Sequence, residues 1–75
     1  KNESFVITGT FNNYTRDDLK ELLAAKGLLV SNNISKKTSG LIVGDKPGSK
    51  YQKALDLKIK IILEKDLIKF LEEFH

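Results

Sequence analysis

Few residues in this chain of 75 have the chemistry for catalysis. The chain has no cysteine and one histidine, His75, at its last position, for which we expect no role. A cysteine nucleophile, a disulfide and a cysteine-based zinc cluster are therefore excluded. The adjacent acidic pairs Asp17-Asp18 and Glu72-Glu73 cannot share a substrate, because neighbours on a helix point about 100° apart. The sequence predicts neither a catalytic residue nor a metal site.

The glycine-containing segment from Gly44 to Lys50 reads GDKPGSK. It lacks the G-x-x-x-x-G-K-[ST] order of a phosphate-binding loop, and its glycines do not form a dinucleotide fingerprint. We therefore expect no bound nucleotide or other cofactor in this domain.

Thr8 and Gly9 are candidates for binding phosphate. They follow the apolar run of residues 5–7, which predicts a buried strand, and open α/β sheets bind their ligands at the carboxyl ends of their strands. A hydroxyl and an exposed backbone N–H at this place suit phosphate oxygens. The alternative is that Thr8-Gly9 merely turns the chain out of the strand, and both interpretations stay open.

Arg16 is the only arginine of the 13 basic residues. It lies in the first turn of a predicted helix, where the helix dipole disfavours a cation by about 0.3–1 kcal/mol. A phosphate contact would explain the position, since arginine binds phosphate through two parallel hydrogen bonds that lysine cannot make. The alternative is a solvated side chain paired with Asp17 or Glu21.

The lysines are unevenly distributed. Residues 26–60 hold eight lysines against two aspartates, whereas the net charge of the whole chain is only +3, so we expect one basic surface. Lys36 and Lys37 precede the third predicted strand, and Lys50 begins the second predicted helix. All three are candidates for sequence-independent phosphate contacts, with simple solvation as the alternative. Tyr51 is expected in the core, and we expect no reading of bases.

Four short apolar runs predict strands at residues 5–7, 28–30, 41–43 and 61–63. The intervening patterns predict three helices. Thr15 and Asp18 have the spacing of a capping box at the start of the first, and Gly27 suits its end. Ser49 is expected to cap the second, which carries Tyr51, Ala54 and Leu55 on one face.

The third helix is marked by Leu67, Phe70, Leu71 and Phe74 at helical spacing. The element order is therefore β-α-β-β-α-β-α. Wholly apolar strands alternating with helices predict a parallel sheet covered on both faces, in a three-layer α/β domain.

Composition agrees with one small folded domain spanning residues 1–75. Hydrophobic residues make up 40% and charged residues 31% of the chain, and no apolar run approaches the roughly 20 residues that span a bilayer. The absence of cysteine fits a reducing cytoplasm. The chain contains no methionine and begins at Lys1, so we expect it to be excised from a larger protein.

Five segments, in this order and spacing, carry a resemblance to the BRCT domain: Phe5-Val6-Ile7-Thr8-Gly9-Thr10, Thr15-Arg16-Asp17-Asp18, Ser35-Lys36-Lys37-Thr38, Leu41-Ile42-Val43-Gly44 and Pro47-Gly48-Ser49-Lys50. The segment of residues 44–50 is most similar to the C-terminal BRCT domain of bacterial NAD-dependent DNA ligases. The large subunit of eukaryotic replication factor C has a related domain with a different loop here.

The resemblance implies a four-stranded parallel sheet in the order 2-1-3-4, with the first and third helices on one face and the second on the other. In phosphate-binding members of this family, the positions that match Thr8, Gly9 and Lys53 contact the phosphate. The replication factor C domain uses an arginine at the position matching Arg16 to bind DNA ends.

The chain also departs from the family pattern. A glycine pair before the second strand is here Lys26-Gly27-Leu28, and a glycine after the second helix is replaced around Leu57-Lys58. The tryptophan common in the third helix is absent, and Phe70 or Ile68 is expected to fill its volume. These departures speak against a tandem, phosphopeptide-reading BRCT domain.

The resemblance thus predicts a monomeric accessory domain of a bacterial, cytoplasmic NAD-dependent DNA ligase, whose parent enzyme seals nicks during replication and repair. Its partners would be DNA at a nick or end and other domains of the ligase, together with possible replication or repair proteins. NAD, a divalent metal and zinc would bind in other domains of the parent. The alternatives are a protein-interaction module, docking another domain or a phosphopeptide, and a replication factor C domain.

Overall fold

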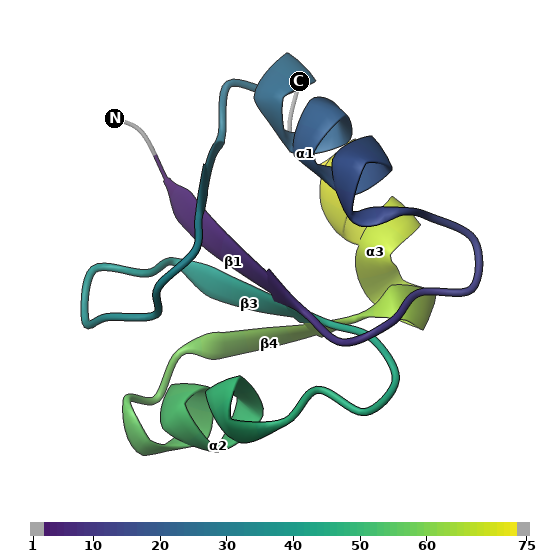
Figure 1. The fold of residues 1–75 in the computed structure, drawn as a ribbon. Helices are drawn as coiled ribbons and strands as arrows, with labels where there is room; N and C mark the ends of the chain where they lie inside the picture. Colours follow the sequence, from purple (N-terminus) through teal and green to yellow (C-terminus); the bar gives the residue numbers. More distant parts are fainter. Residues whose placement is uncertain (1–2, 74–75) are drawn as a thin grey trace.

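The computed structural model describes residues 3–73. Its elements, in chain order, are β1 (Ser4–Thr8), α1 (Arg16–Ala25), β2 (Leu29–Ser31), β3 (Gly40–Val43), α2 (Ser49–Asp56), β4 (Lys60–Leu63) and α3 (Glu64–Glu72). All strand pairs are parallel, and the sheet order is β2-β1-β3-β4 (Figure 1). The predicted element order, the α/β class and the sheet order are all confirmed.

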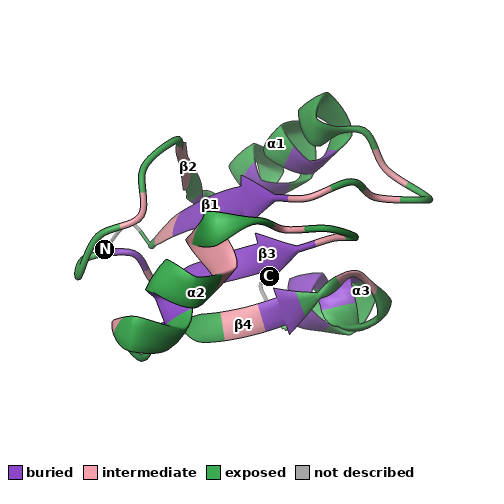
Figure 2. Ribbon diagram, turned by 60° about the horizontal axis from the view of Figure 1, so that its bottom comes forward, coloured by how far each residue is buried: buried purple, intermediate pink, exposed green. Residues whose placement is uncertain are grey.

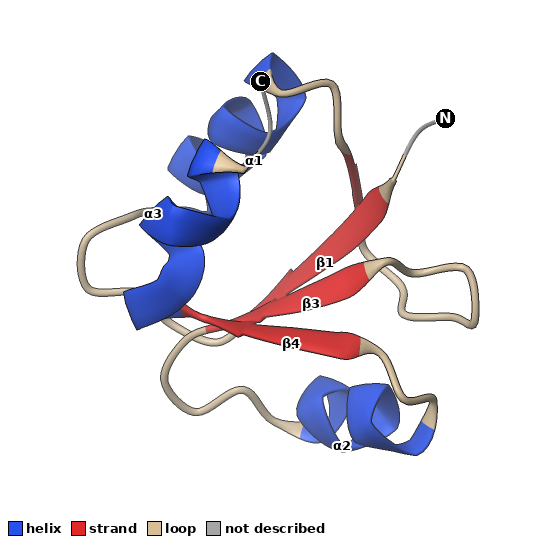
Figure 3. Cartoon of the chain, turned by 180° about the vertical axis from the view of Figure 1, so that it is seen from behind, coloured by secondary structure: helices blue, strands red, loops and turns tan. Residues whose placement is uncertain are grey.

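The sheet separates two apolar clusters. α1 and α3 cover one face, and α2 covers the other (Figure 3). Alternation along β1 sends Phe5 and Ile7 into the cluster under α1 and α3, while Val6 points into the smaller cluster under α2. The central strands β1 and β3 are therefore buried on both faces (Figure 2), which explains why their sequences read as continuous apolar runs.

The ends of α1 are as predicted. The Thr15 hydroxyl accepts a hydrogen bond from the Asp18 N–H, and the Asp18 carboxylate accepts one from the Thr15 N–H, each at 3.0 Å. Gly27 has a φ of 79° and donates to the Ala24 carbonyl, while Leu28 donates to the Leu23 carbonyl. This is a Schellman end. Because Leu28 closes the helix, β2 covers residues 29–31 instead of the predicted 28–30, and Leu29 is 52% exposed.

Two predictions about α2 are wrong. Gly48, with a φ of 74°, is the N-cap residue and no side chain caps the helix, so Ser49 is instead its first residue. Leu55 is 46% exposed, because the buried face of this short helix is centred on Ala54. Tyr51 packs against the smaller cluster as expected, and Leu57, just beyond the helix, packs there too.

In α3 the predicted apolar residues Leu67, Phe70 and Leu71 are buried. Phe70 meets Phe5 edge to face, with ring centroids 5.3 Å apart, whereas Ile68 is 60% exposed. Phe70, and not Ile68, therefore occupies the core position of this helix. The predictions for Phe74 and His75 lie outside the described residues.

Candidate phosphate-binding site

Thr8 and Gly9, which are predicted to bind phosphate, lie where β1 ends. Because the strands are parallel, β1, β3 and β4 all finish at this carboxyl end of the sheet, and α1, α2 and α3 all begin there. The loop after β3 is tied to the end of β1. Thr10 and Asp45 exchange two backbone hydrogen bonds, of 2.9 and 2.7 Å, and the Gly44 N–H donates to the Thr8 carbonyl at 2.9 Å.

No other residue type could occupy position 9 without a rearrangement of the neighbouring backbone. Its φ is +88°, and a Cβ atom would stand 2.8 Å from the Asp45 carbonyl oxygen and 2.9 Å from the Gly44 carbonyl carbon. β2 ends at Ser31, which pairs with Val6, so no strand lies beside Gly9 on that side. Within residues 3–73, the Gly9 N–H makes no backbone hydrogen bond. A backbone donor is therefore presented at the carboxyl end of the sheet.

The Thr8 hydroxyl has an internal partner. Thr8 is only 6% exposed, and its Oγ1 donates a hydrogen bond of 2.7 Å to the Pro47 carbonyl, just before α2. The hydroxyl thus connects β1 to the start of α2. To donate to a phosphate, the hydroxyl would have to give up its hydrogen bond to Pro47. The Gly9 N–H has no such bond to give up within residues 3–73, so it is the more available donor of the two.

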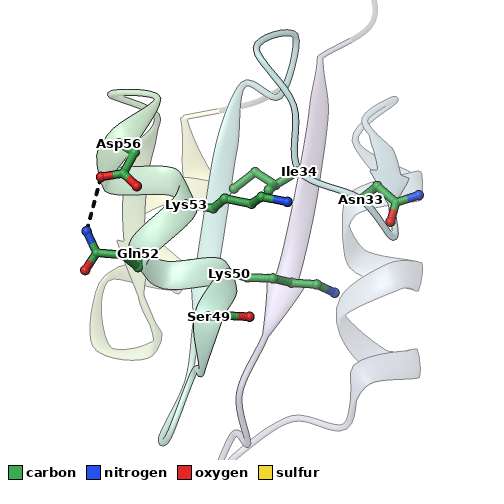
Figure 4. Close-up of a pocket in the computed structure, with 7 residues that line it drawn as sticks. All are labelled: Asn33, Ile34, Ser49, Lys50, Gln52, Lys53 and Asp56. Atoms are coloured by element: carbon green, nitrogen blue, oxygen red, sulfur yellow. Dashed lines mark hydrogen bonds between the residues drawn. The ribbon is translucent and has the colours of Figure 1, made fainter.

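Lys50 and Lys53 come from α2. Lys50 is in the first turn and is half-buried, whereas Lys53 lies one turn further and is exposed. Both side chains extend across the sheet toward the β2–β3 loop (Figure 4). They line a hollow of about 500 Å³ between α2 and this loop, which we call the α2 groove; its lining residues are Asn33, Ile34, Ser49, Lys50, Gln52, Lys53 and Asp56.

Arg16 is the first residue of α1 and is exposed. Arg16 therefore lies at the carboxyl end of the sheet, on the face opposite α2. The loop that leads to it is held from α3: the Glu64 carboxylate accepts hydrogen bonds from the N–H groups of Asn12 and Asn13, both at 2.9 Å. Sequence reasoning missed Glu64, because nothing local links the start of α3 to a loop some 50 residues earlier.

Lys36 and Lys37 are not brought together with the other candidates. Their loop returns to the opposite end of the sheet, where the Ser39 N–H donates to the Ser4 carbonyl and Gly40 pairs with Phe5. At about 3.3 Å per residue, that end is roughly 13 Å from Gly9 along β1. Thr8, Gly9, Lys50 and Arg16 thus lie toward one end of the sheet, Lys53 lies one turn along α2, and the loop of Lys36 and Lys37 leads to the opposite end.

The described residues contain no group of three or more histidine, cysteine, aspartate or glutamate side chains that could hold a metal ion. Nor does the described part of the chain include a helix long and apolar enough to cross a membrane.

The parallel 2-1-3-4 sheet, with two helices on one face and one on the other, meets the expectation for a BRCT domain. The sequence profile of the BRCA1 C Terminus (BRCT) domain matches residues 1–71, so this chain belongs to the BRCT family.

Within that family, the chain is similar to a region of bacterial DNA ligases. It is 53% identical over 68 residues to the DNA ligase of Thermosipho africanus, covering 91% of this chain and 10% of that protein. It is 46% identical over 72 residues to the DNA ligase of Thermotoga neapolitana, covering 96% and 10%. The chain spans about a tenth of the length of the curated relatives it matches.

Proposed function

We propose that this chain is an accessory, non-catalytic domain of an NAD-dependent DNA ligase, and that it holds the DNA phosphate backbone near a nick or end. The observation that carries the proposal is the Gly9 N–H, which lacks a backbone partner within residues 3–73 and lies at the end of the sheet where α1 and α2 begin. Helix N-termini favour anions, and Arg16 and Lys50 add cationic side chains on the two sides. The similarity to DNA ligases supports the choice of ligand.

Such a site would bind the DNA phosphate backbone without selecting a base sequence. Phosphate contacts position a protein on DNA, and each neutralised phosphate releases counterions. We therefore expect weak binding to nicked or 5′-phosphorylated duplexes, with affinity falling by about 0.9 log units per log unit of salt for each phosphate engaged. Reading of bases is not expected, since Tyr51 is partly buried and packs against the smaller apolar cluster.

Fluorescence anisotropy on a nicked, 5′-phosphorylated duplex tests the proposal. Arg16→Ala combined with Lys50→Ala should weaken binding and reduce the salt dependence by up to about two phosphates. The matched control is Lys20→Ala combined with Lys69→Ala, which removes the same charge from exposed positions in α1 and α3. Equal loss in both double variants would indicate a general charge effect, and binding that ignores salt would refute the proposal.

The activity of the whole protein is part of the proposal. Adenylation and nick sealing would belong to other domains of a bacterial, cytoplasmic ligase, which would also hold NAD, a divalent metal and zinc. A lysine-containing adenylation motif upstream in the same reading frame would be expected; a reading frame without one would refute the ligase assignment.

A second candidate function is docking of another protein or ligase domain. It is favoured by exposed apolar side chains, above all Ile68 in α3 and Leu29 in β2. Titration with a ligase lacking this domain, in parallel with nicked DNA, separates the two functions. Binding of the protein without binding of DNA would favour docking.

A further inference from the structure

We propose that the outer edge of β4 is a protein-binding surface, which takes an extended segment of a partner protein as a fifth strand of the sheet. The segment would carry apolar side chains and one carboxylate, which meets Lys60. This inference goes beyond the proposed function, because the edge lies at the opposite border of the sheet from β2, away from the α2 groove, and needs no DNA.

The outer side of β4 has no strand beside it within residues 3–73. β3 is its only neighbour in the sheet, paired over residues 60–63, and no backbone hydrogen bond from another described segment reaches these four residues. Figure 2 shows β4 along the border of the sheet. An edge strand presents a row of outward N–H and C=O groups, which is a template for a further strand.

Apolar side chains flank this edge on the α2 face. Ile61 and Leu63 point to this face of β4; Ile61 packs on the smaller cluster, and Leu63 is 38% exposed. Tyr51 and Leu55 are four residues apart and so share one flank of α2. That flank faces β4, because the opposite flank, with Lys53, lines the groove beside the β2–β3 loop.

A hollow flanks the edge on the other face, between β4 and α3. Its lining includes the buried side chains of Ile62 and Phe70 and the exposed side chain of Lys60. The Lys60 Nζ lies 5.5 Å from the centroid of the Phe70 ring. The volume of about 230 Å³ is below the range of about 300–1,000 Å³ that is usual for small-ligand sites, and suits one side chain of an added strand.

Charge and length favour a foreign segment over a second copy of this chain. Lysine on an edge strand opposes pairing of two like edges, and in this case each copy would bring its own Lys60. Two four-residue edges, about 13 Å long, would also bury little of the roughly 1,200 Å² that a stable interface needs. A segment with a carboxylate opposite Lys60 would instead gain an attractive cross-strand pair.

NMR titration with a capped hexapeptide, Thr-Ile-Val-Asp-Val-Thr, tests the proposal. In an antiparallel arrangement its isoleucine would meet Ile62 and its aspartate would meet Lys60. We expect amide shifts at residues 60–63, and binding about 2- to 10-fold weaker when lysine replaces the aspartate. No shifts at these residues would refute the proposal.

A charge exchange makes this preference specific to the edge. In Lys60→Glu the lysine peptide should bind more tightly than the aspartate peptide, a reversal that misfolding cannot imitate. Lys20→Glu, the same charge change at an exposed position in α1, should keep the original preference. The same preference in both variants would overturn the proposal.

Two N-methylated forms of the peptide test backbone pairing. Only alternate amides of an added strand face β4, so methylation of one alternate set should abolish binding, and methylation of the other set should change it little. Equal effects of the two sets would show that the segment does not pair as a strand, and would refute the proposal.

Leu63→Thr tests the apolar flank. Threonine is favoured both in strands and at helix N-caps, and Leu63 occupies both positions, so the fold should be retained. Peptide binding should weaken about 2- to 5-fold, whereas Leu29→Thr, on the edge strand β2, should leave it unchanged. Equal losses would overturn the choice of edge. A dimer in sedimentation that Leu63→Thr dissociates would show a second copy as the occupant and overturn the inference.

Discussion

Replacing Gly9 with alanine should destabilise the domain far more than the same replacement at Gly27. Both glycines have positive φ, +88° and +79°, so both substitutions place a side chain in the left-handed region, at a cost of about 1–2 kcal/mol. Both substitutions also lower the conformational entropy of the unfolded chain, which stabilises the folded state by about 0.4–1 kcal/mol. These two contributions are common to the pair and cancel in the comparison.

The surroundings of the two glycines differ. A Cβ at Gly27 would have nothing within 4 Å, whereas at Gly9 it would meet the Asp45 oxygen at 2.8 Å and Gly44 atoms at 2.9 and 3.0 Å. These are backbone atoms, fixed by the paired hydrogen bonds between Thr10 and Asp45, and they cannot move aside as a flexible side chain would. Overpacking of this kind costs about 1–3 kcal/mol. Gly9→Ala should therefore lose that much more free energy of unfolding than Gly27→Ala.

Thermal unfolding followed by circular dichroism measures the difference. In a domain of this size, 1 kcal/mol corresponds to about 4–8 °C in Tm. Gly9→Ala should thus melt at least about 4 °C below Gly27→Ala. That loss is large against a total stability of about 4–11 kcal/mol for 75 residues. Equal melting temperatures would refute the reasoning, because they would show that the loop after β3 yields to the added methyl group.

Three other substitutions follow from the same structure. Lys58→Gly should raise the free energy of unfolding in urea by up to about 1 kcal/mol, because Lys58 adopts a φ of 59°, in the left-handed region that glycine enters without steric cost; a loss of stability would contradict this. Glu64→Ala should cost about 1–3 kcal/mol and speed hydrogen exchange at Asn12 and Asn13, since both N–H groups lose their acceptor; unchanged exchange would show that the carboxylate does not hold the loop. Thr15→Ala should cost about 1 kcal/mol through loss of the capping box, and Thr15→Ser should restore most of it.

The candidate site shows where local patterns stop being informative. Thr8 and Gly9 could be named from the sequence as candidates because a strand end in a parallel α/β sheet is a common place for a ligand, and their role in binding stays a prediction. That the Thr8 hydroxyl donates to Pro47 could not be foreseen, because the two residues are 39 positions apart. The separation of Lys36 from Gly9 was equally hidden, since it depends on the path of the β2–β3 loop back to the start of β3.

The sequence by itself determined the elements and the class of fold. Residues 5–7 and 41–43 are apolar at every position because central parallel strands are buried on both faces, and Thr15 and Gly27 mark the ends of α1 through bonds made within a few residues. Tertiary structure alone decided which residues meet. Gly48, and not the predicted Ser49, is the N-cap residue of α2, and the Glu64 carboxylate accepts hydrogen bonds from a loop that is distant in the sequence. These outcomes depend on how the loops cross the ends of the sheet, which is set by packing between segments far apart in the chain.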